Sequence, residues 1–332
     1  MDSEFSLIAR LRRALPSAAD PRLLVGIGDD AAVWRDGGYT VATTDTMVEG
    51  VHFLRDAVPA CDVGWKALAA NISDIAAMGA TPAFALVTLC LPPDTDDSWP
   101  DGLYAGIRAC AEAYGVTVAG GDIVSSPTLT ITIALAGAPT LDASGEPLLL
   151  RRDAARAGDV VAVSGPLGGS AGGLRVLRSR GASSDAARLL VARHMRPRPR
   201  VDVGAAAVRA GVRCAIDISD GLLQDLGHIC EASGAGADLR LDDVPIDPAL
   251  SALYPDDART LAATGGEDYE LVVVAQRDAI ERVSAALAAP LEVVGVMTSA
   301  AEHRVRALDS GGREVRFERG GWDHLSRAWL AT

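Results

Sequence analysis

The chain has 332 residues, of which 49% are apolar, and its formal net charge is −13 at pH 7. This length exceeds what one compact core ordinarily fills, so we expect two domains. The acidic balance disfavours nucleic acid and anionic membranes as partners, and no apolar run is long enough to span a bilayer. The five cysteines are scattered and never form a C-x-x-C pair, which favours reduced thiols in a cytoplasm over a disulfide framework or a zinc site.

Hydrophobic periodicity in the first half of the chain predicts helices and strands in alternation. A turn-forming stretch over residues 140–147, with Asp142, Ser144 and Gly145, then indicates a boundary. The predicted helices cover residues 7–15, 63–78 and 99–114, and the predicted strands cover residues 39–43, 83–91, 116–119 and 129–136.

The second half repeats this pattern. It predicts strands over residues 160–163, 213–216, 270–274 and 291–296, helices up to about residue 210, a helix over 222–230 and another between the last two strands. The arginines and prolines of residues 193–200 are typical of an exposed connector. The fold class is therefore α/β in two domains, which we place at residues 1–140 and 150–330.

Six short segments pair an acid with glycine or small polar residues. Singly, each is typical of a turn or a helix cap. The segments are Gly28-Asp29-Asp30, Thr43-Thr44-Asp45-Thr46, Asn71-Ile72-Ser73-Asp74, Gly120-Gly121-Asp122, Asp217-Ile218-Ser219-Asp220-Gly221 and Gly265-Gly266-Glu267-Asp268.

Their positions favour a shared site over six unrelated turns. Asp45, Asp122 and Asp217 follow predicted strands, and α/β folds place their sites at the carboxyl ends of strands. Asp74 falls inside an alanine-rich helix, on the face of Asn71, where an acid is costly unless it is paired or binds a metal. Hard oxygen ligands on separate loops suit Mg²⁺, which completes its shell with water and phosphate oxygens.

Two other features bear on phosphate chemistry. The segment from Val160 to Gly173 predicts a strand, a glycine-rich turn and a helix start, which is either a phosphate-binding turn or a close strand-to-helix turn. It lacks the ending of a Walker loop. Lys66 is the only lysine in the chain, and its surroundings fit neither a P-loop nor the strand lysine of a protein kinase.

The ordered series of motifs resembles the thiamine-monophosphate kinase family. The resemblance runs from about Glu4 to His324. It rests on the acidic segments above and on the longer stretches of sequence around several of them. These stretches are Gly26 to Val33, Thr44 to Phe53, Lys66 to Ala80, Ile216 to Leu222, Gly265 to Leu271 and Gly321-Trp322-Asp323-His324.

The resemblance implies the fold of the aminoimidazole-ribonucleotide synthetase superfamily. In that fold the N-terminal, mixed-sheet domain pairs with a second copy in a dimer, and the nucleotide lies at the dimer and domain junction. It also implies ATP as co-substrate, several Mg²⁺ ions, and direct phosphoryl transfer to the phosphate of thiamine monophosphate. The C-terminal α/β domain completes the nucleotide and thiamine-phosphate site.

The resemblance also implies the site residues. Metal ligands are expected at Asp30, Thr43, Thr44, Asp45, Asp74, Asp122, Asp217 and Asp220. Nucleotide contacts are expected at Tyr104, Gly121, Asp122, Arg152 and Ser219, and thiamine-phosphate contacts at His52, Glu267 and Trp322. Ile123, Ser125 and Gly169 depart from the family pattern, which usually has Thr, Arg and Asp there.

No side chain is expected to act as general base, because the acceptor is a phosphate that is already ionised at neutral pH. The obstacle is electrostatic, since two anionic substrates must approach in line. Alternatives remain open from sequence. One is another synthetase of the superfamily, although the chain lacks an early cysteine for a selenophosphate synthetase and a C-terminal cysteine for a hydrogenase-maturation dehydratase. The other is a non-catalytic divalent-cation-binding protein.

Overall fold

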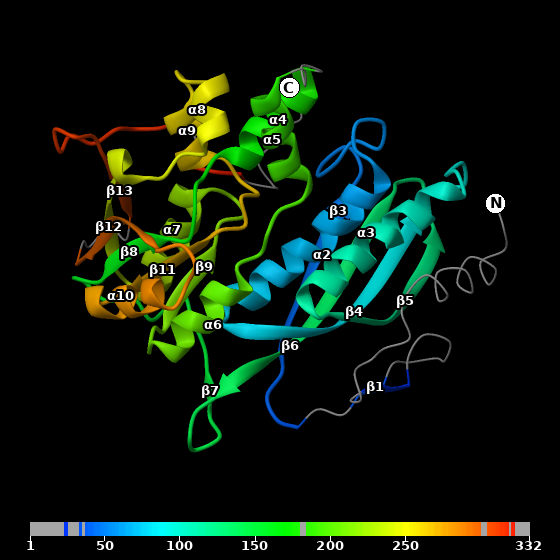
Figure 1. Cartoon of the computed structure of the whole chain (residues 1–332), viewed down its shortest axis with the longest axis horizontal. Helices are drawn as coiled ribbons and strands as arrows, with labels where there is room; N and C mark the ends of the chain where they lie inside the picture. Colours follow the sequence, from blue (N-terminus) through cyan, green and yellow to red (C-terminus); the bar gives the residue numbers. More distant parts are fainter. Residues whose placement is uncertain are drawn as a thin grey trace. The chain divides into compact units, whose positions relative to one another are not determined.

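The computed structural model describes residues 23–25, 33–34, 37–179, 184–299, 304–318 and 320–322. The chain divides into two compact units, Met1–Leu148 and Leu149–Thr332 (Figure 1). Within the described ranges, no helix combines the length and the apolar character needed to cross a membrane. The helix predicted over residues 7–15 lies outside the described residues.

The N-terminal unit is built on a mixed five-stranded sheet. Its strand order is β3 (Val41–Val48), β6 (Thr130–Leu141), β4 (Ala80–Leu91) and β5 (Thr117–Ser125), and β7 (Pro147–Leu148) pairs with β6. Only the pairing of β4 with β5 is parallel, and α3 connects these two strands. A separate two-stranded sheet consists of β1 (Leu23–Val25) and β2 (Val33–Trp34).

Two helices, α2 (Ala60–Ala77) and α3 (Ser98–Tyr114), cover one face of this sheet (Figure 1). Leu68, Ile72 and Ile75 recur at helical spacing on α2 and are fully buried. The facing strands contribute alternate residues such as Ile133 and Val87, which are also fully buried. Packing of this apolar helix face on alternate strand residues therefore forms the core of the unit and confirms the two predicted helices.

Two predicted strand ends are wrong. The strands predicted over 39–43 and 116–119 continue to Val48 and Ser125, so Asp45 and Asp122 lie inside β3 and β5 rather than after them. β3 continues past residue 43 because its polar residues alternate between the two faces of the sheet and because threonine favours the extended backbone. Both strands lie at the edges of the β3–β6–β4–β5 order, where one neighbour suffices to pair a polar segment.

The C-terminal unit has a mixed six-stranded sheet. Its order is β13 (Val305–Leu308), β10 (Gly236–Arg240), β12 (Glu292–Thr298), β8 (Val160–Val163), β11 (Leu271–Ala275) and β9 (Cys214–Asp217). The described helices are α4 (Gly169–Ser179), α5 (Asp185–Met195), α6 (Val201–Arg209), α7 (Leu222–Ser233), α8 (Pro248–Leu253), α9 (Ala258–Thr264) and α10 (Arg277–Ala285).

The central strands β8 and β11 are buried along their whole length, as their continuous apolar sequences require. The predictions for β8, β9, β11, β12, α7 and α10 are confirmed within a few residues. The short elements β10, α8, α9 and β13 were not predicted, because none is long enough to establish a clear period.

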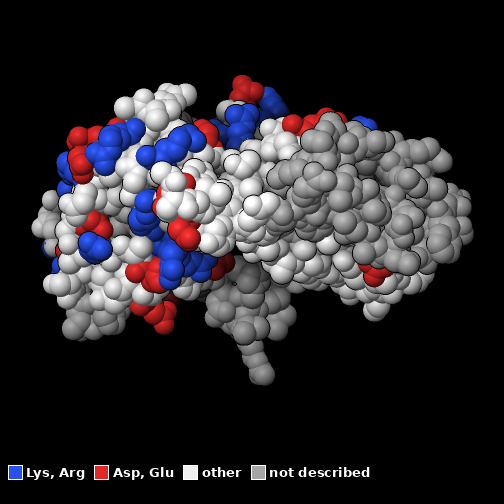
Figure 2. All heavy atoms as spheres, turned by 90° about the horizontal axis from the view of Figure 1, so that it is seen from below, with Lys and Arg blue, Asp and Glu red and all other residues white. Residues whose placement is uncertain are grey.

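The surface of the C-terminal unit carries many exposed ion pairs. Figure 2 shows basic and acidic side chains interspersed over this unit. Examples are Arg282 with Asp278 at 2.7 Å and Arg151 with Asp153 at 2.5 Å. Exposed pairs of this kind each contribute about 0–1 kcal/mol, so they account for much of the charged surface without implying a binding site.

Candidate active site

One group of predicted site residues comes together between β3 and α2 in the N-terminal unit. Thr43 Oγ1 donates a hydrogen bond to Asp74 Oδ2 at 2.5 Å, and the backbone N–H of Asp45 donates to Asn71 Oδ1 at 3.1 Å. Asn71 is fixed in turn because its Nδ2 donates to the carbonyl of Ala67. The alternation of β3 directs Thr43 and Asp45 to the helix-covered face, while the spacing on α2 places Asn71 and Asp74 one turn apart.

The two carboxylates of this group disfavour each other's charge. Burial, and then the charge of Asp74, raises the pKa of Asp45 to about 7. A cation placed between them would remove that penalty, and the group offers only hard oxygen donors. Thr43, Asp45 and Asp74 therefore fit a Mg²⁺ ion by their chemistry.

Thr44 and Asp122 lie on the opposite face of the same sheet. Asp122 pairs in register with Thr88, Thr88 with Thr132, and Thr132 with Thr46, so these four side chains share one face. Directly paired residues point to the same side of a sheet, whereas neighbours in one strand point to opposite sides. Asp45, the neighbour of Thr46, therefore points to the other face, and Thr44, two residues from Thr46, shares the face of Asp122. Three strand spacings also separate β3 from β5, about 14 Å. Within one chain, Asp122 is therefore not brought to the pair of Asp45 and Asp74.

Gly121 has a packing reason to be glycine. A Cβ there would lie 1.8 Å from the carbonyl oxygen of Val87 on β4. Nearby, Asp122 is exposed, and its Oδ1 accepts a hydrogen bond from the N–H of Ile123. The backbone of this segment is thus set by its strand pairing, and the predicted nucleotide contacts at Gly121 and Asp122 stay predictions.

Three other residues of the N-terminal unit bear on the site. His52 is held at the end of β3, where its Nδ1 accepts a hydrogen bond from the N–H of Val48 at 3.0 Å. Tyr104 is buried in α3, and burial raises the pKa of its phenol. Lys66 is buried in α2, at 4% exposure. Asp30 lies outside the described residues.

A second group comes together in the C-terminal unit, around the loop between β9 and α7. Asp217 was predicted to follow a strand over residues 213–216; it is instead the last residue of β9, and it is buried. Asp225 organises the loop that follows, since its Oδ2 accepts hydrogen bonds from the N–H groups of Ser219, Asp220 and Gly221 at 3.1, 3.1 and 2.9 Å. Burial is the main cause that raises the pKa of Asp225 to about 7. Sequence reasoning missed Asp225, although an acid in the first turn of a helix after Ser-Asp-Gly is a recognisable capping signal.

Two further segments bind to this loop. The N–H of Glu267 donates to the carbonyl of Ser219 at 2.8 Å, and the N–H of Trp322 donates to the carbonyl of Asp220 at 3.0 Å. Gln224 Nε2 lies within hydrogen-bonding distance of Asp220 Oδ2 and of the carbonyl oxygen of Trp322. Predicted metal, nucleotide and thiamine-phosphate residues thus meet in one place, although they come from distant parts of the sequence. Asp323 and His324 lie outside the described residues.

Arg152 lies at the other end of β9 from Asp217. Its carbonyl oxygen accepts a hydrogen bond from Ser233 Oγ at 2.7 Å and is 4.0 Å from the Sγ of Cys214, the first residue of β9. The length of β9 therefore separates that carbonyl from Asp217. The side chain of Arg152 is exposed, so its predicted nucleotide contact stays a prediction.

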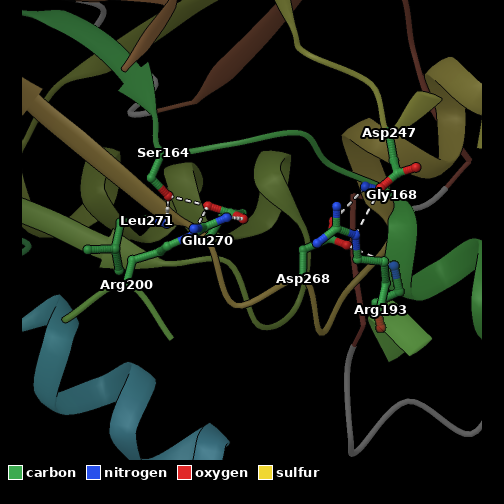
Figure 3. A network of polar contacts seen from close by, with 9 residues as sticks. Ser164, Gly168, Arg193, Arg200, Asp247, Asp268, Glu270 and Leu271 are labelled. Carbon is green, nitrogen blue, oxygen red and sulfur yellow. Dashed lines mark hydrogen bonds and ion pairs between the residues drawn. The ribbon is translucent and has the colours of Figure 1, made fainter. Parts of the chain in front are cut away.

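The glycine-rich turn before α4 binds a carboxylate of the protein itself. Asp268 accepts hydrogen bonds from the N–H of Gly168 at 2.6 Å and from the N–H of Ser170 at 3.0 Å (Figure 3). Burial first, and then the charges of Glu270 and Asp247, raise the pKa of Asp268 to about 7. These two N–H groups already have an anionic partner, which favours the strand-to-helix turn over the phosphate-binding turn.

Glu270 is held on the other side of the same segment. Its carboxylate forms a bidentate ion pair with Arg200 and accepts a hydrogen bond from Ser164 Oγ at 2.5 Å (Figure 3). The side chain of Glu270 is 8% exposed and that of Arg200 is 28% exposed. The connector predicted over residues 193–200 is therefore only partly correct: residues 193–195 end α5, and the remaining residues are exposed only in part, since Arg200 anchors their end beside β11.

Both units match models of one protein class. Residues 28–138 match the family "AIR synthase related protein, N-terminal domain", and residues 156–307 match "AIR synthase related protein, C-terminal domain". The mixed-sheet units and the acidic loops described above are thus those of an AIR synthase related protein, as the resemblance implied.

Closer relatives define the family. The chain is 39% identical to the thiamine-monophosphate kinase of Escherichia coli (strain K12), over 97% of this chain and 98% of that protein. The crystal structure of thiamine-monophosphate kinase from Stenotrophomonas maltophilia K279a is similar, with a TM-score of 0.81, 37% identity, and 94% and 98% of the two chains covered. The structure of AaThiL complexed with AMPPCP and TMP has a TM-score of 0.77 and 32% identity, covering 98% and 99%. The chain belongs to the thiamine-monophosphate kinase family.

Proposed function

We propose that the chain transfers a phosphoryl group from ATP to thiamine monophosphate and so makes thiamine diphosphate. The observation that carries the proposal is the similarity over nearly the whole chain to thiamine-monophosphate kinases, joined to the oxygen-rich group of Thr43, Asp45 and Asp74. A solved relative, AaThiL, is complexed with AMPPCP and TMP, which supports a nucleotide and a phosphate acceptor as the two substrates.

The carboxylate groups of the two units suit a reaction between two anions. We propose that Thr43, Asp45 and Asp74 in the N-terminal unit, and Asp217 and Asp220 in the C-terminal unit, hold Mg²⁺. Asp30, Thr44 and Asp122 complete the proposed ligand set. Bound Mg²⁺ would neutralise phosphate charge and fix the phosphates in line. The residues themselves select hard cations, because they present only oxygen donors.

The C-terminal group supplies the proposed contacts with the rest of the substrates. Ser219 lies beside Glu267, and Trp322 beside Asp220, so nucleotide and thiamine phosphate are proposed to bind adjacent loops. Trp322 would stack on the cationic thiazolium ring, at roughly 0.5–2 kcal/mol. His52 adds a further thiamine-phosphate contact, and Tyr104, Gly121 and Arg152 add nucleotide contacts. No side-chain general base is needed for an acceptor that is already ionised.

Substrate choice tests the proposal directly. Purified protein with MgATP should release ADP in the presence of thiamine monophosphate and form thiamine diphosphate, identified by mass spectrometry, while free thiamine should remain unchanged. Turnover of another phosphorylated metabolite in place of thiamine monophosphate would point to another synthetase of the superfamily. Magnesium binding without any ATP turnover would favour a cation-binding protein.

We further propose that the protein is a homodimer that pairs through the face of the β3–β6–β4–β5 sheet opposite α2 and α3. Thr44, Leu86, Ala134 and Val124 are exposed on that face, and Asp122 lies among them. A sheet face with exposed apolar residues is expected to be buried against another layer. Pairing would bring Asp122 and Thr44 of one copy to the facing sheet of the other copy. They would then contribute to the proposed Mg²⁺ ligands, which a single chain does not bring together.

Leu86→Glu should shift the protein from dimer to monomer, since a charge at the centre of an apolar interface is not solvated there. Light scattering after size exclusion measures the mass. Leu189→Glu is the matched control, because Leu189 is 60% exposed on α5 of the other unit and should leave the mass unchanged. A wild-type monomer, or a dimer that tolerates Leu86→Glu, would count against this face.

We also propose that the protein acts in the cytoplasm. None of the five cysteines, all of which lie in the described ranges, forms a disulfide, and three of them, Cys110, Cys214 and Cys230, are buried. Burial raises the pKa of the Cys230 thiol to about 11, which disfavours the reactive thiolate. These thiols suit a reducing cytoplasm, where ATP is also available.

A further inference from the structure

A buried histidine contacts Glu267, and nothing in the proposed reaction accounts for it. His194 lies in the last turn of α5 and is 4% exposed, and Ser170 lies in the first turn of α4 and is 1% exposed. His194 Nδ1 lies 3.0 Å from Ser170 Oγ, in a hydrogen bond, and 3.5 Å from Glu267 Oε2, a contact that is an ion pair only when the imidazole is protonated. One imidazole nitrogen therefore faces both a buried hydroxyl and the predicted substrate-binding carboxylate.

Close packing of the two helices brings the histidine to this position. A Cβ at Gly173 would lie 2.1 Å from the carbonyl oxygen of Leu190 and 2.8 Å from the Cβ of His194. Only glycine on α4 allows α5 to approach this closely. The sequence of α4 thus fixes how far His194 reaches toward Ser170 and Glu267.

The backbone of Glu267 is fixed independently of its side chain. Its φ is 65°, in the left-handed region that non-glycine residues rarely adopt, and its N–H is bonded to the carbonyl of Ser219. The next residue, Asp268, is bound by the N–H groups at the start of α4, as Figure 3 shows. Residue 267 is therefore held in an unfavourable conformation by contacts on both sides, which points to a required direction for its carboxylate.

We propose that His194, itself held by Ser170, is a positioning residue that orients the Glu267 carboxylate toward the acceptor substrate. The inference rests on the proposed function, in which Glu267 contacts thiamine monophosphate. Contact with the imidazole at Oε2 limits rotation of the carboxylate, so that binding the substrate orders fewer degrees of freedom. In this role His194 would act through Glu267 and would not itself contact the substrate.

Steady-state kinetics of three variants test this role. His194→Leu removes both ring nitrogens and keeps an apolar volume, and it should raise the KM for thiamine monophosphate about tenfold, the effect of losing a hydrogen bond to a charged group. The KM for MgATP and kcat should stay within about twofold. His194→Asn places an amide near the position of Nδ1 and should recover most of the loss. Ser170→Ala should raise the same KM by about threefold.

A purely structural role predicts a different pattern. In that case all three variants would lose thermal stability, and KM would not change in the fraction that folds. An unchanged KM in a folded His194→Leu would overturn the inference. Should His194→Leu fail to fold, Ser170→Ala and His194→Asn decide: equal KM values for both would overturn the inference, and a higher KM for Ser170→Ala alone would support it.

Glu267→Gln, measured beside the wild type, separates this inference from the proposed function. A wild type that does not turn over thiamine monophosphate would reject the function and the inference with it. An active wild type whose KM rises in Glu267→Gln but not in His194→Leu would reject the positioning role alone. If Glu267→Gln itself has no effect on KM, Glu267 needs no positioning and the inference is overturned.

Discussion

Asp45→Asn and Asp74→Asn should each lower kcat by about 10²–10³-fold while the protein still folds. Losing a well-placed electrostatic stabiliser of the transition state costs about 3–4 kcal/mol. The amide keeps the shape of the side chain but removes one negative charge from the proposed cation site. Thr43 still reaches an oxygen at position 74, and Asn71 still accepts from the backbone N–H of residue 45, since neither contact needs the charge. Added Mg²⁺ should partly restore turnover in Asp45→Asn if weakened cation binding is the defect.

The thermal stability of the Asp45→Asn and Asp74→Asn variants should not fall with their kcat. The pKa of Asp45 is raised by burial and by the charge of Asp74, so removing either charge relieves a penalty of the folded state above pH 7. The melting temperature without ligand should therefore hold or rise. Near-normal turnover in a folded variant would sink the proposed role, and an unfolded variant would show the acid to be structural.

Asp142→Asn is the matched control for these variants. Asp142 lies in a turn of the same unit, where its Oδ1 accepts hydrogen bonds from Ser144 and from the N–H of Glu146. The pKa of this carboxyl is lowered by the side-chain bond of Ser144 and by backbone bonds, as expected for an acid that stabilises a turn. Its loss should affect stability slightly and leave kcat unchanged.

The parts of the fold that could be predicted from sequence are those with a single strong period. Helix α2 repeats apolar residues on one face, and β8 and β11 are uninterrupted apolar strands, so local pattern and burial agree. Asp217 was placed within one residue, because it ends a short buried strand whose apolar residues are evident in the sequence. Agreement between local sequence and global packing made these elements predictable.

The errors arise where pairing partners decide the structure. Asp45 and Asp122 lie inside edge strands whose polar residues resemble turns, and only the ladders with β6 and β4 extend those strands. The face on which Asp122 lies follows from register, which no local pattern specifies. His194 could not be identified as a neighbour of Glu267, because that contact depends on how separate elements meet. Asp225 is different, since its hydrogen bonds are local and its position in the first turn of α7 could have been read from the sequence.

Arg200→Met should cost about 2–4 kcal/mol of the free energy of unfolding, the largest stability effect that we expect from a single ion pair in the described chain. The substitution leaves the Glu270 carboxylate, 8% exposed, without its bidentate partner. Removing one member of a buried pair costs about 3–5 kcal/mol, and the 28% exposure of Arg200 reduces that cost through solvent screening. The hydrogen bond from Ser164 would still compensate part of the charge.

The free energy of unfolding of Arg200→Met, measured by urea denaturation, is compared with that of two further variants. Arg240→Met removes the same side chain from an exposed pair with Asp243, whose partners are 60% and 43% exposed, and should cost no more than about 1 kcal/mol. The double variant Arg200→Met with Glu270→Leu removes the unpaired charge and should recover a large part of the loss, because apolar replacements of buried pairs are often neutral. If Arg200→Met is no less stable than Arg240→Met, the Glu270 carboxylate is better solvated than its burial indicates, and the ion pair does not hold the segment from Glu267 to Glu270 in place.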